Sequence, residues 1–142
     1  MEQEQRTGST AELAVSSKLI SIGYDLSFPY GSLPYDIVAD KGGRLIRIQV
    51  KSATLSKHGS YRCTLARGKG CAKRYSKNEC DVIIMFAPYS QDYDGVYSDG
   101  FYVVPVEDAG GTGGATLFPS GKGTGNIRIC KWEKYRDGWK NI

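Results

Sequence analysis

Three polar side chains, Asp36, Gln49 and Lys51, have the types and the spacing that metal-assisted hydrolysis of a phosphodiester requires. In that chemistry a divalent cation held by oxygen ligands activates water, and an ammonium group stabilises the charge that develops on the phosphate. Gln49 and Lys51 are two residues apart, so on a strand they point to the same face. The carbonyl of Val50 between them would be a further oxygen ligand, and Glu12 is a candidate second carboxylate.

A β-hairpin is the element that must position these side chains. Residues 35–39 and 44–52 are predicted to form its two strands, joined by a turn that contains two glycines. In the second strand apolar and polar residues alternate, so one face is apolar and the other carries Gln49 and Lys51. Closing the turn would place Asp36 beside them.

Glu12, the candidate second carboxylate, belongs to a helix that is predicted over residues 8–22. Ser9 is expected to be its N-cap, and Gly23 its stop. The apolar residues that recur at helical spacing, and so predict a buried stripe, are Ala11, Val15, Leu19 and Ile22. Because this helix must pack against the sheet, the carboxylate of Glu12 can reach the same rim.

Each of these residues also has an interpretation without chemistry. Glu12 would complete a capping box at the start of its helix. Asp36 would be a turn-exit aspartate, and Gln49 and Lys51 would be solvent-facing residues of a strand, like Arg47. Taken singly, these interpretations are the simpler ones. Taken together, and with a basic stretch that begins at Lys51, the residues favour an active site.

Basic residues dominate residues 51–78, a segment that contains no Asp or Glu. They are Lys51, Lys57, Arg62, Arg67, Lys69, Lys73, Arg74 and Lys77. A segment of one charge sign favours a polyanionic partner, whereas a merely solvated face, the alternative, usually carries both signs. Within it, Tyr61 and Arg62 belong to a predicted strand that would enter a DNA groove as part of a β-ribbon.

Composition and length set the remaining limits. A chain of 142 residues with 40% hydrophobic residues is predicted to form one domain, residues 1–142. The N-terminus is polar, and no apolar run approaches the roughly 20 residues of a membrane span, so a cytosolic protein is expected.

The 4 cysteines of the chain form no CxxC pair, and the chain has 1 histidine. This pattern favours buried free thiols over a zinc site.

The other elements are predicted from pattern alone. Further strands are expected at residues 24–28, 60–65, 81–87 and 101–106. Residues 81–87 (DVIIMFA) are almost entirely apolar and should be buried on both faces. Residues 110–125 are rich in glycine and suggest a loop or loose hairpin, and their GKGT lacks the spacing of a phosphate-binding loop. Trp132, Tyr135 and Trp139 recur at helical spacing and predict a helix that docks on the core.

The motifs together resemble a known family. Asp36 followed by Gln49-Val50-Lys51 resembles the PD-(D/E)XK nuclease signature, in which an aspartate precedes a (D/E)-x-K triplet by a hairpin turn, and Glu12 resembles the upstream acidic residue of many members. The ordered segments GSTAELAVSSKLISIGY, SFPYGSLPYDIVAD, RLIRIQVKSA, DVIIMFAP and GFYVVPVED look like the branch containing the bacterial homing endonuclease encoded within a group I intron. The sequence departs from the signature in two places. Tyr35 is inserted before the aspartate, and Gln49 replaces the second acid. The intron-encoded branch is similar in having glutamine at the second position.

This resemblance implies an α/β fold with a restriction-endonuclease-like core: a central mixed β-sheet flanked by α-helices, with a catalytic β-hairpin. It implies that Asp36, the Val50 carbonyl and Glu12 hold Mg²⁺ or another divalent cation such as Mn²⁺. Gln49 would position the metal or its water, and Lys51 would orient the nucleophile and stabilise developing charge.

The resemblance also implies a substrate and an assembly. The chain would be a sequence-specific double-strand DNA endonuclease that assembles as a homodimer or tetramer, is bacterial or phage-encoded, and acts at the nucleoid within the cytoplasm. The residues expected to contact DNA are Lys57, Arg62, Arg67, Lys69, Lys73, Arg74 and Lys77.

Three alternatives remain open from the sequence. The first is a structure-selective nuclease similar to Holliday-junction resolvases. The second, motivated by the neutral Gln49, is a non-catalytic DNA-binding module that retains the fold. The third is an RNA-binding domain that uses the basic segment together with Tyr61 and Tyr75.

Overall fold

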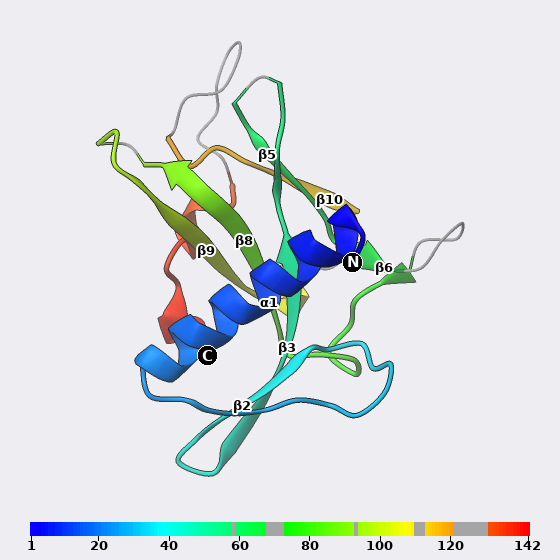
Figure 1. Cartoon of the computed structure of the whole chain (residues 1–142). Coiled ribbons are helices and arrows are strands. Elements are labelled where there is room, and N and C mark those ends of the chain that lie inside the picture. The colour runs from blue at the N-terminus through cyan, green and yellow to red at the C-terminus, as the bar shows by residue number, and fades with distance from the viewer. Residues whose placement is uncertain (58, 68–72, 93, 110–112, 121–130) are drawn as a thin grey trace.

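Five strands form the central sheet (Figure 1). They are β1 (Asp25–Ser27), β2 (Ile37–Lys41), β3 (Arg44–Ser52), β8 (Val82–Gln91) and β9 (Tyr97–Pro105), in the order β1-β2-β3-β8-β9. The β3–β8 pair is parallel and the other pairs are antiparallel, so the sheet is mixed. The computed structural model describes residues 1–57, 59–67, 73–92, 94–109, 113–120 and 131–142.

The remaining elements surround this sheet. They are helices α1 (Gln3–Ser21) and α2 (Val106–Ala109), strands β4 (Thr54–Leu55), β5 (Tyr61–Thr64), β6 (Ala66–Arg67), β7 (Lys73–Arg74) and β10 (Gly114–Leu117), and the 3₁₀ turns η1 (Glu133–Tyr135) and η2 (Trp139–Asn141). Strands β10, β5 and β4 form a small antiparallel sheet, and β6 pairs with β7. The expected α/β fold with a central mixed sheet and a β2–β3 hairpin is confirmed.

Helix α1 covers one face of the central sheet (Figure 1). Ala11, Val15 and Leu19 are buried, and they belong to the same apolar cluster as Ile48 and Val50 of β3. The predicted helical stripe and the predicted apolar face of β3 therefore pack against each other. Because one face of β3 packs against α1, the other face, which carries Gln49 and Lys51, points away from α1.

The opposite face of the sheet is covered by the small sheet and the C-terminal segment. Ile83 and Met85 of β8 share one apolar cluster with Leu117 of β10 and Tyr135 of η1. Residues 82 to 87 of β8 are buried throughout, with alternate side chains in the two clusters. The prediction that this strand is buried on both faces is confirmed.

The start of α1 differs from the prediction. The helix begins at Gln3, with Glu2 as its N-cap, and Glu2 and Gln5 form the capping box. Ser9 is therefore not an N-cap, and the prediction of a helix start there is wrong. The first two turns contain no apolar stripe that could have marked them, but the first turn, residues 3–6, is built from good helix formers. The end of the helix is as predicted, with C-cap Ile22 followed by Gly23 at φ 100°.

Strands β8 and β9 form a longer hairpin than predicted. A register shift between Ala87 and Ser90 lets β8 continue beyond the bulge, where Tyr89 has a φ of 47°. Strand β9 therefore begins at Tyr97, earlier than the strand predicted from residue 101. In the glycine-rich region, residues 114–117 form β10, and most of the rest lies outside the described residues.

The C-terminal segment docks on the core as expected, but not as an α-helix. Trp132 and Tyr135 are buried in one apolar cluster, and Trp139 packs against the other. Asp137 has a φ of 50°, which breaks the chain into the two 3₁₀ turns. The prediction of a helix here is wrong, although the aromatic spacing did identify the buried residues.

Candidate active site

Asp36 immediately precedes β2, and its carboxylate lies next to Gln49 of β3. The turn between the strands contains Gly42 and Gly43, whose φ values of 64° and 84° suit a two-residue hairpin and favour glycine. This turn sets the register in which the Asp36 N–H donates to the Ile48 carbonyl over 2.8 Å. The predicted hairpin thus brings these site residues together.

The side-chain amide of Gln49 lies between Asp36 and the main chain of Val50. Its Nε2 donates to Asp36 Oδ2 over 2.7 Å and to the Val50 carbonyl oxygen over 3.1 Å. The Val50 N–H donates to the same Asp36 oxygen over 2.8 Å. The amide nitrogen therefore occupies a point between two oxygens that a hard cation would share, and turning the amide over would add Gln49 Oε1 as a third oxygen. The residues present fit a divalent cation.

Glu12 lies in the interior of α1 and faces the charge of Asp36. Partial burial raises the pKa of Glu12, and the negative charge of Asp36 raises it further. Because the capping box is formed by Glu2 and Gln5, the interpretation of Glu12 as a capping residue is wrong. Its helix position instead places a second carboxyl group within electrostatic reach of the hairpin.

Asp36 is half-buried among groups of both charge signs. Burial raises its pKa, while the hydrogen bond from the Val50 N–H and the positive charge of Lys51 act in the opposite direction. The net effect is a raised pKa, so the ionised form is less favourable here than in water. A bound cation would favour the ionised forms of both Asp36 and Glu12.

Lys51 contacts the aromatic ring of Tyr75, a residue that lines a cleft together with Asp36 and Gln49. Its Nζ lies 5.1 Å from the centroid of the Tyr75 ring. A cleft of about 330 Å³ is lined by Ser32, Leu33, Pro34, Asp36, Gln49 and Tyr75. The contact between Lys51 and Tyr75 was missed by sequence reasoning, because no local pattern indicates which distant side chain a lysine will meet.

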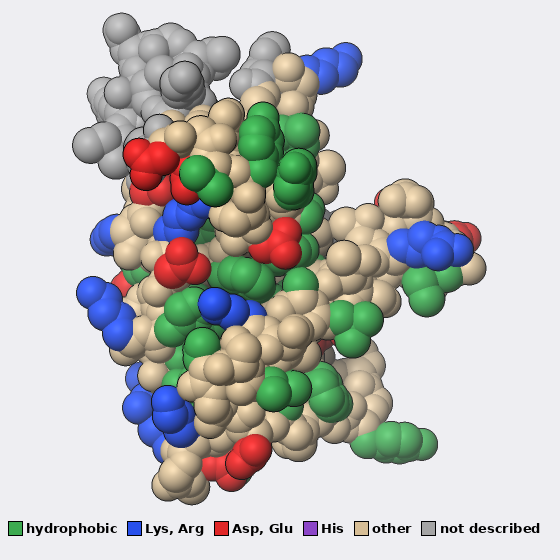
Figure 2. Space-filling view, turned by 60° about the vertical axis from the view of Figure 1, so that its left-hand side comes forward, with side chains coloured by type: hydrophobic (Ala, Val, Ile, Leu, Met, Phe, Trp, Pro, Cys, Tyr) green, Lys and Arg blue, Asp and Glu red, His purple; other side chains and the backbone are tan. Residues whose placement is uncertain are grey.

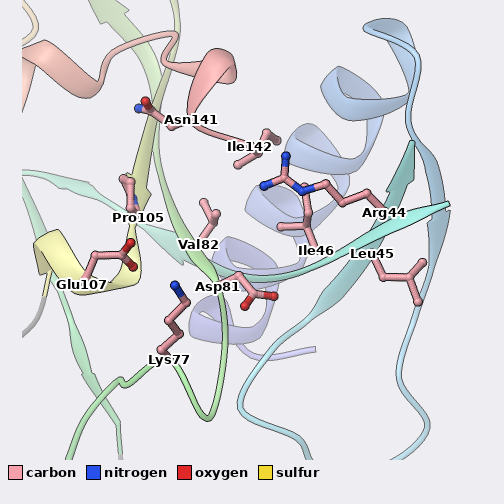
Figure 3. A pocket seen from close by; sticks show the side chains of 10 residues that line it. All are labelled: Arg44, Leu45, Ile46, Lys77, Asp81, Val82, Pro105, Glu107, Asn141 and Ile142. Carbon is pink, nitrogen blue, oxygen red and sulfur yellow. The ribbon is translucent and has the colours of Figure 1, made fainter. Parts of the chain in front are cut away.

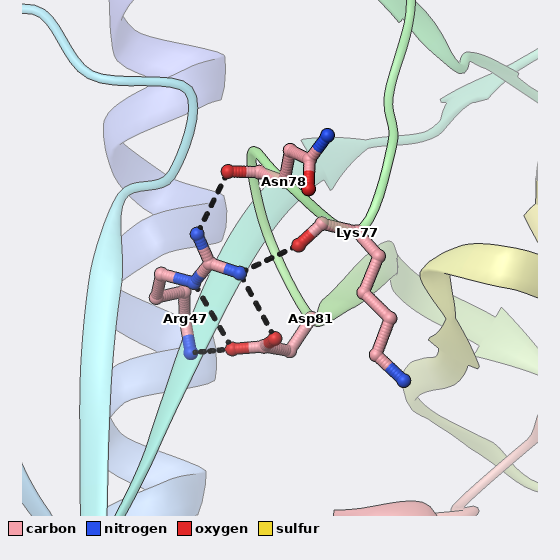
Figure 4. A network of polar contacts seen from close by, with 4 residues as sticks. All are labelled: Arg47, Lys77, Asn78 and Asp81. Atoms are coloured by element: carbon pink, nitrogen blue, oxygen red, sulfur yellow. Dashed lines mark hydrogen bonds and ion pairs between the residues drawn. The ribbon is translucent and has the colours of Figure 1, made fainter.

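Arg47 is not the solvent-facing strand residue that was expected. Its guanidinium forms an ion pair with Asp81 over 3.1 Å and donates to the carbonyls of Lys77 and Asn78 over 2.7 and 3.0 Å. Figure 4 shows how these contacts hold the chain that precedes β8. Partial burial raises the pKa of Asp81, but the hydrogen bonds from Arg47 outweigh it and lower the pKa below its usual value.

The residues expected to bind DNA are only partly described. Lys57, Arg62, Arg74 and Lys77 are exposed. Arg67 and Lys73 lie in the backbone of β6 and β7, but their side chains, and all of Lys69, lie outside the described residues. On the face of the molecule seen in Figure 2, acidic and basic side chains are interspersed, as on an ordinary solvated surface.

The cysteines do not form a metal site in the described part of the chain. Cys63 and Cys80 are buried free thiols, as predicted, and burial raises the pKa of each to about 12. Cys71, Cys130 and His58 lie outside the described residues. Among the residues that are described, no three His, Cys, Asp or Glu side chains gather at one point.

Within the described residues, no helix is both long and apolar enough to cross a lipid bilayer.

A family model matches the sequence, and a solved structure matches the fold. The family model described as PD-(D/E)XK endonuclease matches residues 2–118. The solved structure of a bacterial homing endonuclease, I-Ssp6803I, superimposes with a TM-score of 0.78 over 98% of this chain and 92% of that one. The two sequences are 24% identical, so this similarity establishes the fold. No curated protein is significantly similar to the chain in sequence.

Proposed function

Because this chain belongs to the PD-(D/E)XK endonuclease family, we propose that it is a homing-type, sequence-specific endonuclease that hydrolyses double-stranded DNA with a divalent metal ion. The observation that carries the proposal is the position of the Gln49 amide, whose nitrogen bridges Asp36 and the Val50 carbonyl. These oxygens are of the kind that Mg²⁺ or Mn²⁺ prefers. Residues 1–142 would act as one nuclease domain in the cytoplasm, at the nucleoid.

Asp36, the Val50 carbonyl and Glu12 would hold the cation, and Gln49 would complete the oxygen set through Oε1. When bound, the cation supplies a more acidic water and neutralises charge on the phosphate. The neutral Gln49 lowers the charge of the ligand set relative to a second acid, and Glu12 compensates for this. The interaction between the charges of Glu12 and Asp36 supports this assignment.

Lys51 would act at the phosphate and not at the metal. Its ammonium orients the attacking water and stabilises the negative charge that develops on the phosphate oxygens. The location of Lys51 supports this role, since it lies on the same face of β3 as Gln49 and its charge already acts on Asp36. The same ammonium lies over the ring of Tyr75.

The basic segment of residues 51–78 would bind the DNA backbone and groove. Lys57, Arg62, Arg67, Lys69, Lys73, Arg74 and Lys77 are the proposed contacts. The exposure of Arg62 and Arg74 supports this assignment. Arginines would read guanine edges in the major groove, and lysines would contact phosphates.

We also propose that the protein forms a homodimer or tetramer through the β8–β9 hairpin. Tyr89 and Tyr97 are stacked at 5.1 Å, yet they are 71% and 54% exposed, which is unusual for two contacting aromatic residues. Asp92 and Asp94 lie on the same hairpin and disfavour contact with DNA phosphates. A second copy of the chain is therefore the proposed occupant. Light scattering should give a smaller particle for the double Tyr89→Ser and Tyr97→Ser variant, and an unchanged one for the exposed Tyr30→Ser control.

The proposed cleavage is tested with a library of randomised duplex DNA. The protein is incubated with the library and Mg²⁺, and the cut ends are sequenced, with Asp36→Asn protein as the matched control. A shared sequence around the cuts supports the homing-type function. Cutting of four-way junctions without a shared sequence would identify a structure-selective nuclease instead. Binding without any nicking in Mg²⁺ or Mn²⁺ would identify a non-catalytic DNA-binding module.

A further inference from the structure

The ammonium of Lys51 is held by an aromatic ring. Lys51 Nζ lies 5.1 Å from the centroid of the Tyr75 ring, within the range of a cation–π interaction. Tyr75 is only 7% exposed, so its ring is fixed by packing, and it lines the same cleft as Asp36 and Gln49. Lys51 forms no ion pair with any residue that the structure describes. A lysine side chain has many rotamers, and the ring selects those that keep the ammonium at this cleft.

The chain that carries Tyr75 is anchored by a second residue of β3. Arg47 donates to the carbonyls of Lys77 and Asn78 and pairs with Asp81 (Figure 4). Arg47 and Lys51 are four residues apart on one strand, so they share a face of the sheet. The segment after Tyr75 is thus fastened to the same strand that presents the lysine.

The segment between Tyr75 and β8 is buried at Tyr75 and Cys80 but borders open space on one side. A second cleft, of about 270 Å³, lies on its outer side and is lined in part by Lys77, Asp81 and Val82 (Figure 3). Arg44, at the start of β3, lines the far side of this cleft. The hydrogen bonds from Arg47 therefore restrain the segment beside a space that no side chain fills.

We propose that Tyr75 is a positioning residue that holds the Lys51 ammonium at the cleft of Asp36 and Gln49, and that Arg47 keeps Tyr75 in place. This inference rests on the proposed nuclease function. The ring fixes the ammonium before the substrate arrives, so less ordering remains for the transition state. The effect therefore falls on the cleavage step and not on DNA binding.

The test compares two substitutions of Tyr75 on a duplex that the wild-type protein cuts. Tyr75→Leu removes the ring, and we expect single-turnover cleavage to slow by about 5- to 30-fold with DNA affinity unchanged. Tyr75→Phe keeps the ring and should cleave at the wild-type rate. The control is Tyr24→Leu, since Tyr24 is also 7% exposed and also lies 5.1 Å from a lysine, Lys41, but outside this site. Assayed below its melting temperature, this control should cleave normally.

Arg47 is tested in the same assay. Arg47→Met should slow cleavage, whereas Arg44→Met, on the same strand and exposed, should not. If Arg47 acts through Tyr75, combining Arg47→Met with Tyr75→Leu should slow cleavage little more than Tyr75→Leu does. If the double variant slowed cleavage by the product of the two single effects, Arg47 would act independently of Tyr75, which would contradict the proposal.

A spectroscopic measurement separates this inference from the nuclease function. The ε-methylene protons of Lys51 should be shifted upfield by the ring current in the wild-type and Tyr75→Phe proteins, and unshifted in Tyr75→Leu. An unshifted wild-type signal would overturn the inference, as would equal losses of cleavage in Tyr75→Phe and Tyr75→Leu, or full cleavage by Tyr75→Leu where Lys51→Ala is inactive. A shifted signal in a wild-type protein that cuts no DNA would refute the nuclease function, and with it the positioning role, while leaving the contact itself established.

Discussion

Gln49 Nε2, on β3, donates a hydrogen bond of 2.7 Å to Oδ2 of Asp36, the residue just before β2. The same nitrogen also donates to the Val50 carbonyl, so two oxygens converge on one N–H₂ group. A divalent cation at this point would need an oxygen from Gln49 and not a nitrogen. Binding of the cation therefore requires the amide to turn over.

The amide of Gln49 should report this rotation directly. On addition of saturating Mg²⁺, the side-chain N–H₂ signals of Gln49 should shift strongly, because both hydrogen bonds to Asp36 and Val50 are replaced. The measurement is a ¹⁵N-labelled NMR titration. Asp36→Asn protein should show little change, and Gln91, which is exposed on the β8–β9 hairpin, serves as an internal control. Unchanged Gln49 signals at saturation would contradict the assigned ligand set.

Replacing Gln49 by glutamate should make stability depend on the metal. Gln49→Glu removes a donor to Asp36 and adds a negative charge beside Asp36 and Glu12. In EDTA at neutral pH we expect a loss of about 1 to 3 kcal/mol in the free energy of unfolding. Mg²⁺ should restore stability more in this variant than in the wild-type protein, as measured by thermal denaturation with and without the ion. An equal response to Mg²⁺ in both proteins would show that residue 49 does not meet the cation.

The raised pKa of Glu12 predicts a pH-dependent gain in stability on its removal. Burial and the charge of Asp36 raise this pKa above 4.5, so the folded protein holds the proton more tightly than the unfolded chain does. The free energy of unfolding therefore falls as pH rises from about 4.5 through the native pKa. In EDTA, Glu12→Gln should be more stable than the wild-type protein at neutral pH, and the difference should vanish below about pH 4, where the carboxyl is protonated in both states.

Urea denaturation across pH 4 to 8 measures this effect, with values taken in EDTA so that no metal favours the ionised carboxyl. Glu4→Gln is the matched control, because Glu4 is exposed on the same helix. It should gain nothing at neutral pH. A Glu12→Gln protein that is less stable than the wild type at neutral pH would contradict a raised pKa of this carboxyl.

The exposed arginines of the basic segment should contribute to DNA affinity through counterion release. Each of Arg62→Ala and Arg74→Ala should weaken binding and reduce the slope of log affinity against log salt by about one. Fluorescence anisotropy with a labelled duplex over a range of NaCl concentrations provides the slope. Lys140→Ala, an exposed residue of η2, should leave the slope unchanged. Slopes equal to that of the wild type in both arginine variants would remove this segment from the DNA interface.

The hairpin was predictable because its signals are local. Alternation along β3 identifies the face that carries Gln49 and Lys51, and the two glycines of the turn set the register that brings Asp36, just before β2, next to Gln49. The buried strand β8 was equally readable from its continuous apolar run. For these elements, period and turn chemistry act over a few residues and agree with the final packing.

The parts that were not predicted depend on contacts between distant residues or on polar helix turns. The first turns of α1 carry no apolar period, so Ser9 was taken for the cap in place of Glu2. The 3₁₀ turns of the C-terminal segment follow from docking against β9, not from local propensity. Likewise, the contact between the Tyr75 ring and Lys51 joins residues far apart in the sequence, and no local pattern indicates it.

The most direct test of the account is cleavage measured beside binding for Asp36→Asn and Lys51→Ala. Both variants should bind a target duplex as the wild-type protein does in Ca²⁺, a cation that suits oxygen ligands, and both should lose at least about 100-fold in single-turnover cleavage with Mg²⁺. The account predicts binding retained and cleavage lost. Cleavage at the wild-type rate in either variant would contradict it, since that residue would then not belong to the site that the hairpin builds around Gln49.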